Sequence, residues 1–112
     1  KEMFKIADFW EKGEEAYKAV MVLSLSEFSD FVNSIFKTIV PLQNEKEESK
    51  QHAQLFDRFI EWLCIENRNE ELGYIVSVFL DGKYESANNF IKENCAKACE
   101  IMRLFTEKNC VA

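Results

Sequence analysis

The stretch LFDRFIEWL, residues 55–63, decides the fold of this chain. Its apolar side chains recur at helical spacing and cover most of the circumference, because only Asp57, Arg58 and Glu61 are polar. We therefore predict a helix here, over about residues 45–66. An apolar arc this wide needs covering on two sides, either by two neighbouring helices or by one neighbour and a partner.

Upstream of this helix, Ser24 and Glu27 have the spacing of a capping box, in which each side chain accepts a hydrogen bond from the other residue's backbone amide. A second helix is predicted to begin there. It should stop near Val40, since Pro41 disfavours helical geometry in the residue before it. The stripe that it buries consists of Phe28, Phe31, Val32, Ile35 and Ile39.

The first helix is predicted over about residues 2–23. Gly13 lies on its apolar stripe, although a glycine inside a helix costs up to about 1 kcal/mol relative to alanine. This position predicts either a close approach of another helix or a kink. The stripe recurs at steps of three and four and comprises Met3, Ile6, Trp10, Gly13, Tyr17 and Val20.

Two further helices follow the central one. Asn69 is predicted to cap a fourth helix, which stops at Gly82, because glycine readily takes the left-handed conformation that closes a helix. Ser86 is predicted to cap a fifth helix that reaches about Lys108. The buried face of the fourth helix comprises Leu72, Ile75, Val76, Phe79 and Leu80, and that of the fifth comprises Ala87, Ile91, Cys95, Ala98, Met102 and Phe105.

These elements predict one domain over residues 1–112, an all-α compact bundle of about five antiparallel helices. A chain of 112 residues, 47% of them hydrophobic, has the usual size and composition of a single domain. Three Gly and one Pro leave few residues that interrupt regular elements. Short connections between successive helices favour antiparallel packing.

Residues 80–87, Leu-Asp-Gly-Lys-Tyr-Glu-Ser-Ala, resemble the turn between the paired helices of a tetratricopeptide repeat. Residues 12–17 show a fainter version of the same pattern around Gly13. The resemblance implies an alternative architecture, in which tetratricopeptide-like helical hairpins stack instead of closing into a bundle.

The formal net charge of −6 makes attraction to a nucleic-acid backbone or to an anionic membrane unfavourable. The longest apolar run, Ala19 to Leu23, is far shorter than the roughly 20 residues of a membrane-spanning helix. The chain also begins without a secretory signal pattern. We therefore expect no direct nucleic-acid binding, no membrane association and a cytoplasmic location.

The sequence contains no motif of a nucleotide-binding, hydrolytic or zinc-protease site, and its three glycines are too scattered to hold a phosphate. Adjacent acidic residues such as Glu14 and Glu15 diverge on a helix, so they make a poor general acid and base pair. The one histidine, His52, is too few for a di-iron bundle. We predict that the chain is not an enzyme and needs no cofactor or metal.

The most obvious chemistry lies in the cysteines. Cys64, Cys95 and Cys99 are predicted to be reduced packing residues, because free cysteine is often buried. A disulfide between Cys95 and Cys99 would unwind the helix, and zinc would lack partners because His52 is too distant. A second alternative function is a small-molecule or thiol-based sensor with Cys95 and Cys99 as its reactive thiols. The fourth cysteine is Cys110.

The aromatic content is high for one small bundle, with ten Phe, two Trp and three Tyr. The leading hypothesis is a protein–protein interaction or adaptor module in which some of them form an exposed patch. Its partner is another protein, with a second copy of the chain, and hence a homodimer, as one candidate. The aromatic residues outside the main stripes are Phe9, Phe36, Trp62 and Phe90.

Acidic residues gather at the start of the central helix and around the turn that follows it. The two clusters are Glu45, Glu47 and Glu48, and Glu66, Glu70 and Glu71. Such clusters usually mark a helix start and a solvated turn. They also suggest an alternative function, an acidic inhibitor or regulator. In it, these carboxylates would mimic phosphates and block the cleft of a nucleic-acid-binding protein.

Overall fold

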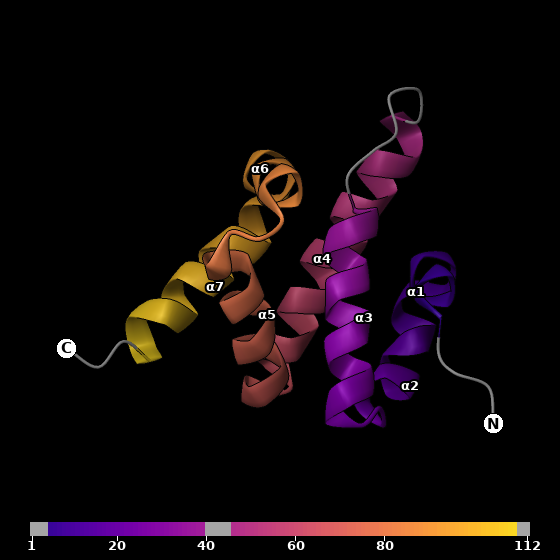
Figure 1. Cartoon of the computed structure of the whole chain (residues 1–112), viewed down its shortest axis with the longest axis horizontal. Coiled ribbons are helices and arrows are strands. Elements are labelled where there is room, and N and C mark those ends of the chain that lie inside the picture. The colour runs from indigo at the N-terminus through magenta and orange to yellow at the C-terminus, as the bar shows by residue number, and fades with distance from the viewer. Residues whose placement is uncertain (1–4, 40–45, 110–112) are drawn as a thin grey trace.

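The structure is a computed structural model and describes residues 5–39 and 46–109. All the elements in these two ranges are helical, so the prediction of an all-α fold is confirmed (Figure 1). The first and the fifth predicted helices are each divided. In chain order the elements are α1 (Ile6–Lys12), the 3-10 turn η1 (Gly13–Ala16), α2 (Tyr17–Met21), α3 (Leu25–Thr38), α4 (Lys46–Ile65), α5 (Asn69–Asp81), α6 (Glu85–Asn94) and α7 (Ala96–Asn109).

The central element is α4, and α3, α4 and α5 reverse direction one after another (Figure 1). α4 packs against α5, α6 and α7, and its Phe59 also contacts aromatic rings of α1, α2 and α3. Helices of the same chain therefore cover the apolar arc of residues 55–63 from two sides. This is the first of the two arrangements that the sequence allows. The fully buried residues of this apolar arc are Phe56, Phe59, Ile60 and Leu63.

Phe59 lies at the centre of an aromatic cluster that joins four elements. Its ring centroid is 5.1 Å from that of Phe9, 5.3 Å from that of Tyr17 and 6.0 Å from that of Phe31. The contacts with Phe9 and Phe31 are edge-to-face, with interplanar angles of 74° and 89°. Such pairs add about 0.5–1.5 kcal/mol beyond the burial of their area. Many of the aromatic residues therefore pack in the core.

α3 begins at the predicted capping box. The Glu27 amide donates to the Ser24 hydroxyl at 3.2 Å, and the Ser24 amide donates to the Glu27 carboxylate at 3.0 Å. At the other end the C-cap is Ile39, one residue before the predicted stop. Val40 and Pro41, on which that prediction rests, lie outside the described residues.

The first predicted helix is not continuous, and its predicted start at residue 2 lies outside the described residues. α1 ends at Gly13, whose φ of 59° and ψ of −122° are angles that glycine alone adopts readily. Space is also tight here, because a Cβ would lie 3.0 Å from the Cδ2 of Leu55 on α4, which would have to shift. The kink and the close approach of another helix are both confirmed.

The turn between α4 and α5 is closed by backbone hydrogen bonds. Asn67 has a φ of 56°, and the amides of Asn67 and Arg68 donate to the carbonyls of Cys64 and Leu63. This is a Schellman motif with asparagine in the left-handed position. The predicted cap at Asn69 was wrong, because Asn69 is already the first residue of α5 and the N-cap makes no side-chain bond.

The fifth predicted helix is divided at Cys95, whose φ of −124° and ψ of 65° are not helical. Its predicted cap, Ser86, was also wrong, since the N-cap of α6 is Tyr84 and makes no side-chain cap bond. The start of α7 is capped from α4 instead: the Ala98 amide donates to Oδ1 of Asp57 at 2.8 Å. A carboxylate of another helix thus satisfies the amide that a local cap would take.

Candidate functional site

The aromatic residues predicted to form an exposed patch do not share one surface. Phe9 and Phe36 are 0% and 1% exposed, so their assignment to the surface was wrong. Phe9 is buried because its ring contacts Phe31 of α3 as well as the core of α4. Trp62 and Phe90 are half-buried and pack against the core.

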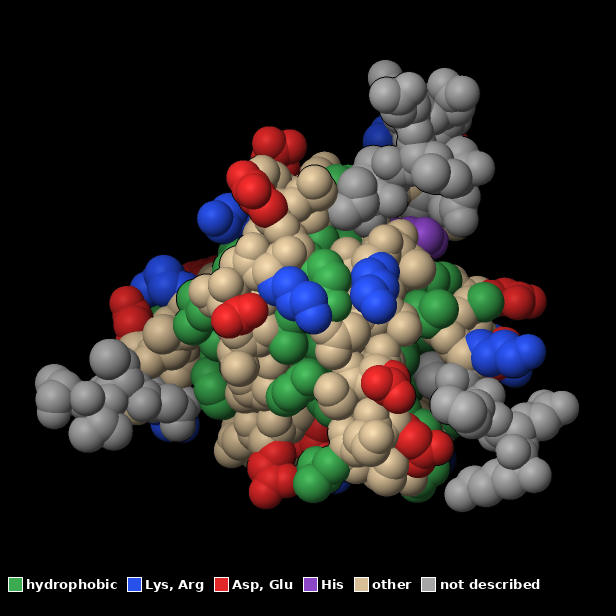
Figure 2. All heavy atoms as spheres, viewed as in Figure 1, with side chains coloured by type: hydrophobic (Ala, Val, Ile, Leu, Met, Phe, Trp, Pro, Cys, Tyr) green, Lys and Arg blue, Asp and Glu red, His purple; other side chains and the backbone are tan. Residues whose placement is uncertain are grey.

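Aliphatic side chains are exposed instead. Leu80 near the end of α5 is 63% exposed, so its predicted burial was wrong, and Leu104 on α7 is 49% exposed. The other three lie on two turns. Val22 is 82% exposed, Leu25 is 85% exposed and Ile65 is 67% exposed. Val22 and Leu25 flank the turn between α2 and α3, and Ile65 is the last residue of α4. Both turns lie at the lower edge of Figure 1, and Figure 2 shows hydrophobic and acidic side chains along that edge. We call the surface of Val22, Leu25 and Ile65 the apolar end.

A contact between the two turns holds the apolar end together. Nε of Arg68, after α4, donates to Sδ of Met21, the last residue of α2, at 3.0 Å. Met21 directly precedes Val22, and Arg68 lies three residues after Ile65. The contact therefore places Val22 and Ile65 at the same end of the fold, although they are far apart in the sequence.

Four backbone amides at the apolar end donate to hydrogen bonds within the chain. The amides of Ser24 and Glu27 are used in the capping box of α3. The amides of Asn67 and Arg68 are used in the Schellman motif after α4. This surface therefore offers side chains to a partner, while these four backbone donors are already taken.

Acidic residues border the apolar end. Glu66 and Glu70 are exposed in the turn after α4 and in the first turn of α5. Nε of Arg68 lies 3.8 Å from a carboxylate oxygen of Glu71, so its charge is partly compensated. Lys18 is exposed one turn before Val22. The local balance is thus negative, as it is for the whole chain.

A groove of about 690 Å³ lies between α3 and α5, and Asn33, Tyr74 and Leu80 are among its lining residues. Two of its polar residues, Asn33 and Tyr74, are engaged within the fold. The Tyr84 hydroxyl donates to Oδ1 of Asn33 at 2.5 Å, and the hydroxyls of Ser29 and Tyr74 are 2.6 Å apart. These bonds tie α3 to α5 and to the start of α6, which gives the groove a structural role.

The predicted acidic cluster at the start of α4 is described only in part. Glu47 is exposed in the first turn of α4. Glu45 lies outside the described residues, and the side chain of Glu48 is not among those described. The interpretation of this cluster as a phosphate mimic therefore stays a prediction.

The three described cysteines are free thiols in different surroundings. Sγ of Cys95 donates to the Ala53 carbonyl at 3.5 Å, and burial raises the pKa of Cys95 to about 12. Burial also raises the pKa of Cys99. A reactive thiol needs a lowered pKa, so neither residue favours the sensor hypothesis. Cys64 is exposed, so its predicted burial was wrong, and Cys110 lies outside the described residues.

Asp57 is an acidic side chain of α4 that accepts a hydrogen bond from the backbone of another helix. It accepts the Ala98 amide, and one turn further along α4 Glu61 pairs with Lys97. Burial raises the pKa of Asp57, although the hydrogen bond from Ala98 and the charge of Lys97 act in the opposite direction. These contacts fix the start of α7 on α4 and thereby account for the position of the carboxylate.

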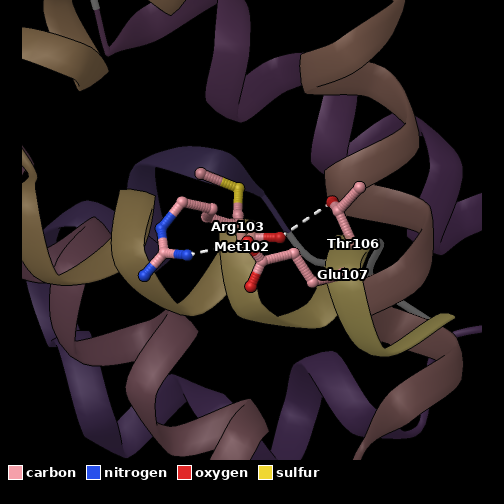
Figure 3. A network of polar contacts seen from close by, with 4 residues as sticks. All are labelled: Met102, Arg103, Thr106 and Glu107. Carbon is pink, nitrogen blue, oxygen red and sulfur yellow. Dashed lines mark hydrogen bonds and ion pairs between the residues drawn. The ribbon is translucent and has the colours of Figure 1, made fainter. Parts of the chain in front are cut away.

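The outer face of α7 carries a local network of polar contacts (Figure 3). Nη1 of Arg103 lies 3.0 Å from Oε1 of Glu107, and the Thr106 hydroxyl donates to the Met102 carbonyl at 2.8 Å. The Arg103 and Glu107 side chains are 58% and 62% exposed, so solvent screens the pair and it stabilises by less than about 0.5 kcal/mol. We interpret the Arg103–Glu107 pair as part of a solvated helix face, whereas Met102 is buried.

Comparison with known proteins assigns no family to the chain. No protein-family model matches it, and neither does a curated protein or a solved structure. The resemblance of residues 80–87 to a tetratricopeptide turn therefore remains a local one. Within residues 5–39 and 46–109, no helix is long and apolar enough to cross a membrane, and no three His, Cys, Asp or Glu side chains gather as metal ligands.

Sequence reasoning missed the apolar end. The available signal was the presence of Val22, Leu23 and Leu25 around Ser24, because turns and caps usually carry polar residues. Ile65 gave a weaker signal, as an apolar residue in the last turn of a helix is common. Only the fold shows that the two turns are neighbours.

Proposed function

We propose that this chain is a non-enzymatic protein-interaction module that binds its partner through the apolar end. The observation that carries the proposal is the exposure of three large aliphatic side chains on two turns that the contact between Arg68 and Met21 joins. Contiguous apolar surface with a polar rim is typical of protein-binding sites. Covering one such side chain contributes roughly 1.5–3 kcal/mol, before the entropy of association is subtracted.

The fold itself has little use for these side chains. Val22 and Leu25 keep more than four fifths of their surface in water, so they contribute little to the core. α3 is started by the capping box, which needs only Ser24 and Glu27. A binding role accounts for large aliphatic residues at positions where folding does not require them.

The proposal is tested with a surface variant that keeps the fold. Val22, Leu25 and Ile65 are replaced together by serine, and the circular-dichroism spectrum is expected to stay helical. Wild-type and variant proteins are immobilised, and the proteins that each retains from native lysate are quantified by mass spectrometry. Wild type should retain a defined set that the triple variant loses.

Leu104→Ser is the matched control, because Leu104 is an aliphatic residue on α7 that is 49% exposed. It should retain the same set as wild type. Sedimentation of the same three proteins measures self-association through the apolar end, which the proposal includes. A strictly monomeric wild type that retains nothing, or a triple variant that behaves like wild type, would contradict the proposal.

A cytoplasmic location is proposed as well. It is supported by the three described cysteines, which are free thiols as expected in a reducing compartment. Cell fractionation checks it, and recovery of the protein from a secreted fraction would exclude it.

A further inference from the structure

We propose that the partner of the apolar end is a short amphipathic helix of another protein, with aliphatic side chains flanked by lysine or arginine. This inference rests on the proposed function and names the chemistry of the partner. It follows from three properties of the surface: its size, its charge and the state of its backbone.

The size of the apolar end favours a short segment over a second copy of the chain. Three aliphatic side chains expose on the order of a few hundred Å². A stable interface of standard size buries about 800 Å² on each partner, and obligate dimers bury more. One helix that inserts two or three aliphatic anchors matches the smaller area.

The charge of the border favours a cationic partner. Glu66 directly follows Ile65 and Glu70 lies in the first turn of α5, and both are exposed, whereas Arg68 is held near Glu71 and Met21. A second copy that used the same surface would bring these carboxylates toward each other, which is unfavourable. Lysine or arginine beside the anchors of a partner would instead find opposite charge.

The backbone of the apolar end favours a helix over an extended segment. An extended segment gains affinity by pairing its backbone with a free edge. Here the amides of Ser24, Glu27, Asn67 and Arg68 already donate within the chain. A helix satisfies its own backbone, and its side chains at positions i, i+3 and i+4 form a compact row of anchors.

Two synthetic probes test the inference. One is a 14-residue amphipathic helix of leucine and lysine, and the other is the same design with glutamate in place of lysine. Binding of each labelled peptide to the full chain is measured by fluorescence anisotropy at two salt concentrations. The lysine peptide should bind and should weaken as salt rises, because screening reduces the attraction to Glu66 and Glu70.

Three variants locate the binding. Leu25→Ser should weaken the lysine peptide by about tenfold, as expected when one buried aliphatic contact is lost. The double variant Glu66→Gln, Glu70→Gln should weaken it and also flatten its salt dependence. Leu104→Ser should stay within about twofold of wild type, because that side chain lies on α7.

The outcomes separate this inference from the proposed function. Equal binding of both peptides, or binding that Leu25→Ser leaves unchanged, overturns the cationic helix as partner. A concentration-dependent dimer that Leu25→Ser abolishes also overturns it, since a second copy would then cover the surface, and the interaction role would still hold. If the wild-type chain binds neither peptide and retains no protein from lysate, both this inference and the proposed function are contradicted.

Discussion

Gly13 carries two separate constraints. Its φ of 59° is in the region that favours glycine, and a Cβ would approach Leu55 to 3.0 Å. We expect Gly13→Ala to lower the free energy of unfolding by about 2–4 kcal/mol, from backbone strain together with overpacking. Urea denaturation measures this.

Gly82→Ala is a reference for a positive φ without a close neighbour, in the left-handed conformation instead of that of Gly13. Gly82 has a φ of 76°, and a Cβ added there would meet nothing within 4 Å, so alanine incurs only the backbone penalty of about 1–2 kcal/mol. Equal losses for Gly13→Ala and Gly82→Ala would show that the approach of Leu55 to Gly13 contributes nothing.

The thiols should differ in reactivity. In a Cys110→Ser background, Cys64 is expected to react with a thiol reagent in the folded protein, because it is exposed. Cys95 should react only on unfolding, since burial raises its pKa to about 12 and leaves very little thiolate at neutral pH. Reaction of Cys95 or Cys99 as fast as that of Cys64 would revive the sensor hypothesis.

At the scale of elements, α7 depends on a cap from α4. Asp57→Ala should lower the free energy of unfolding by about 1 kcal/mol, because the Ala98 amide loses its acceptor. Asp57→Asn keeps a carbonyl oxygen at that place and should stay within about 0.5 kcal/mol of wild type. Equal losses in urea denaturation for both variants would contradict the assigned capping role.

The ionisation of Asp57 gives the same contact a pH dependence. Its folded-state pKa is raised above the usual 3.8, so the folded chain binds the proton more tightly than the unfolded chain does. Ionisation therefore costs stability as pH rises through this window. The stability of wild type relative to Asp57→Asn should increase as pH falls from the raised pKa toward 3.8, and a constant or opposite trend would contradict the shift.

Element ends were predictable from the sequence where the capping group is local. Ser24 and Glu27 are three residues apart, and Gly82 closes α5 in the left-handed conformation, as predicted. The start of α7 was not predictable by local rules, because its cap, Asp57, lies on another helix. The apolar stripe runs through Cys95 without interruption, so periodicity alone predicts one helix where there are two.

For the whole molecule, one core implies cooperative unfolding. Phe59 joins α1, α2 and α3 to α4, so Phe59→Ala should lower the free energy of unfolding by about 3–5 kcal/mol. Tryptophan fluorescence and far-UV circular dichroism should report the same transition. Leu104→Ala, at a half-exposed site, should cost less than about 0.5 kcal/mol. Separate transitions would instead indicate independent units.

Burial was predicted correctly for Ile35 and Met102, which are 1% and 3% exposed, but not for Leu80, which lies at the end of its stripe and is 63% exposed. The apolar end could not be predicted from the sequence, because it depends on which turns lie next to each other in the fold. Phe9 lies outside the predicted stripes and is buried, since its ring contacts Phe31 of α3 and Phe59 of α4. Val22 looks like part of a helix face and is exposed, because α2 ends one residue before it.

The exposed Cys64 directly precedes Ile65. A polarity-sensitive dye coupled to that sulfur would stand at the border of the apolar end, where its emission colour depends on whether water or protein surrounds it. The fold therefore supplies an attachment point for a reporter of occupancy, so that arrival and departure of a partner could be timed directly in solution.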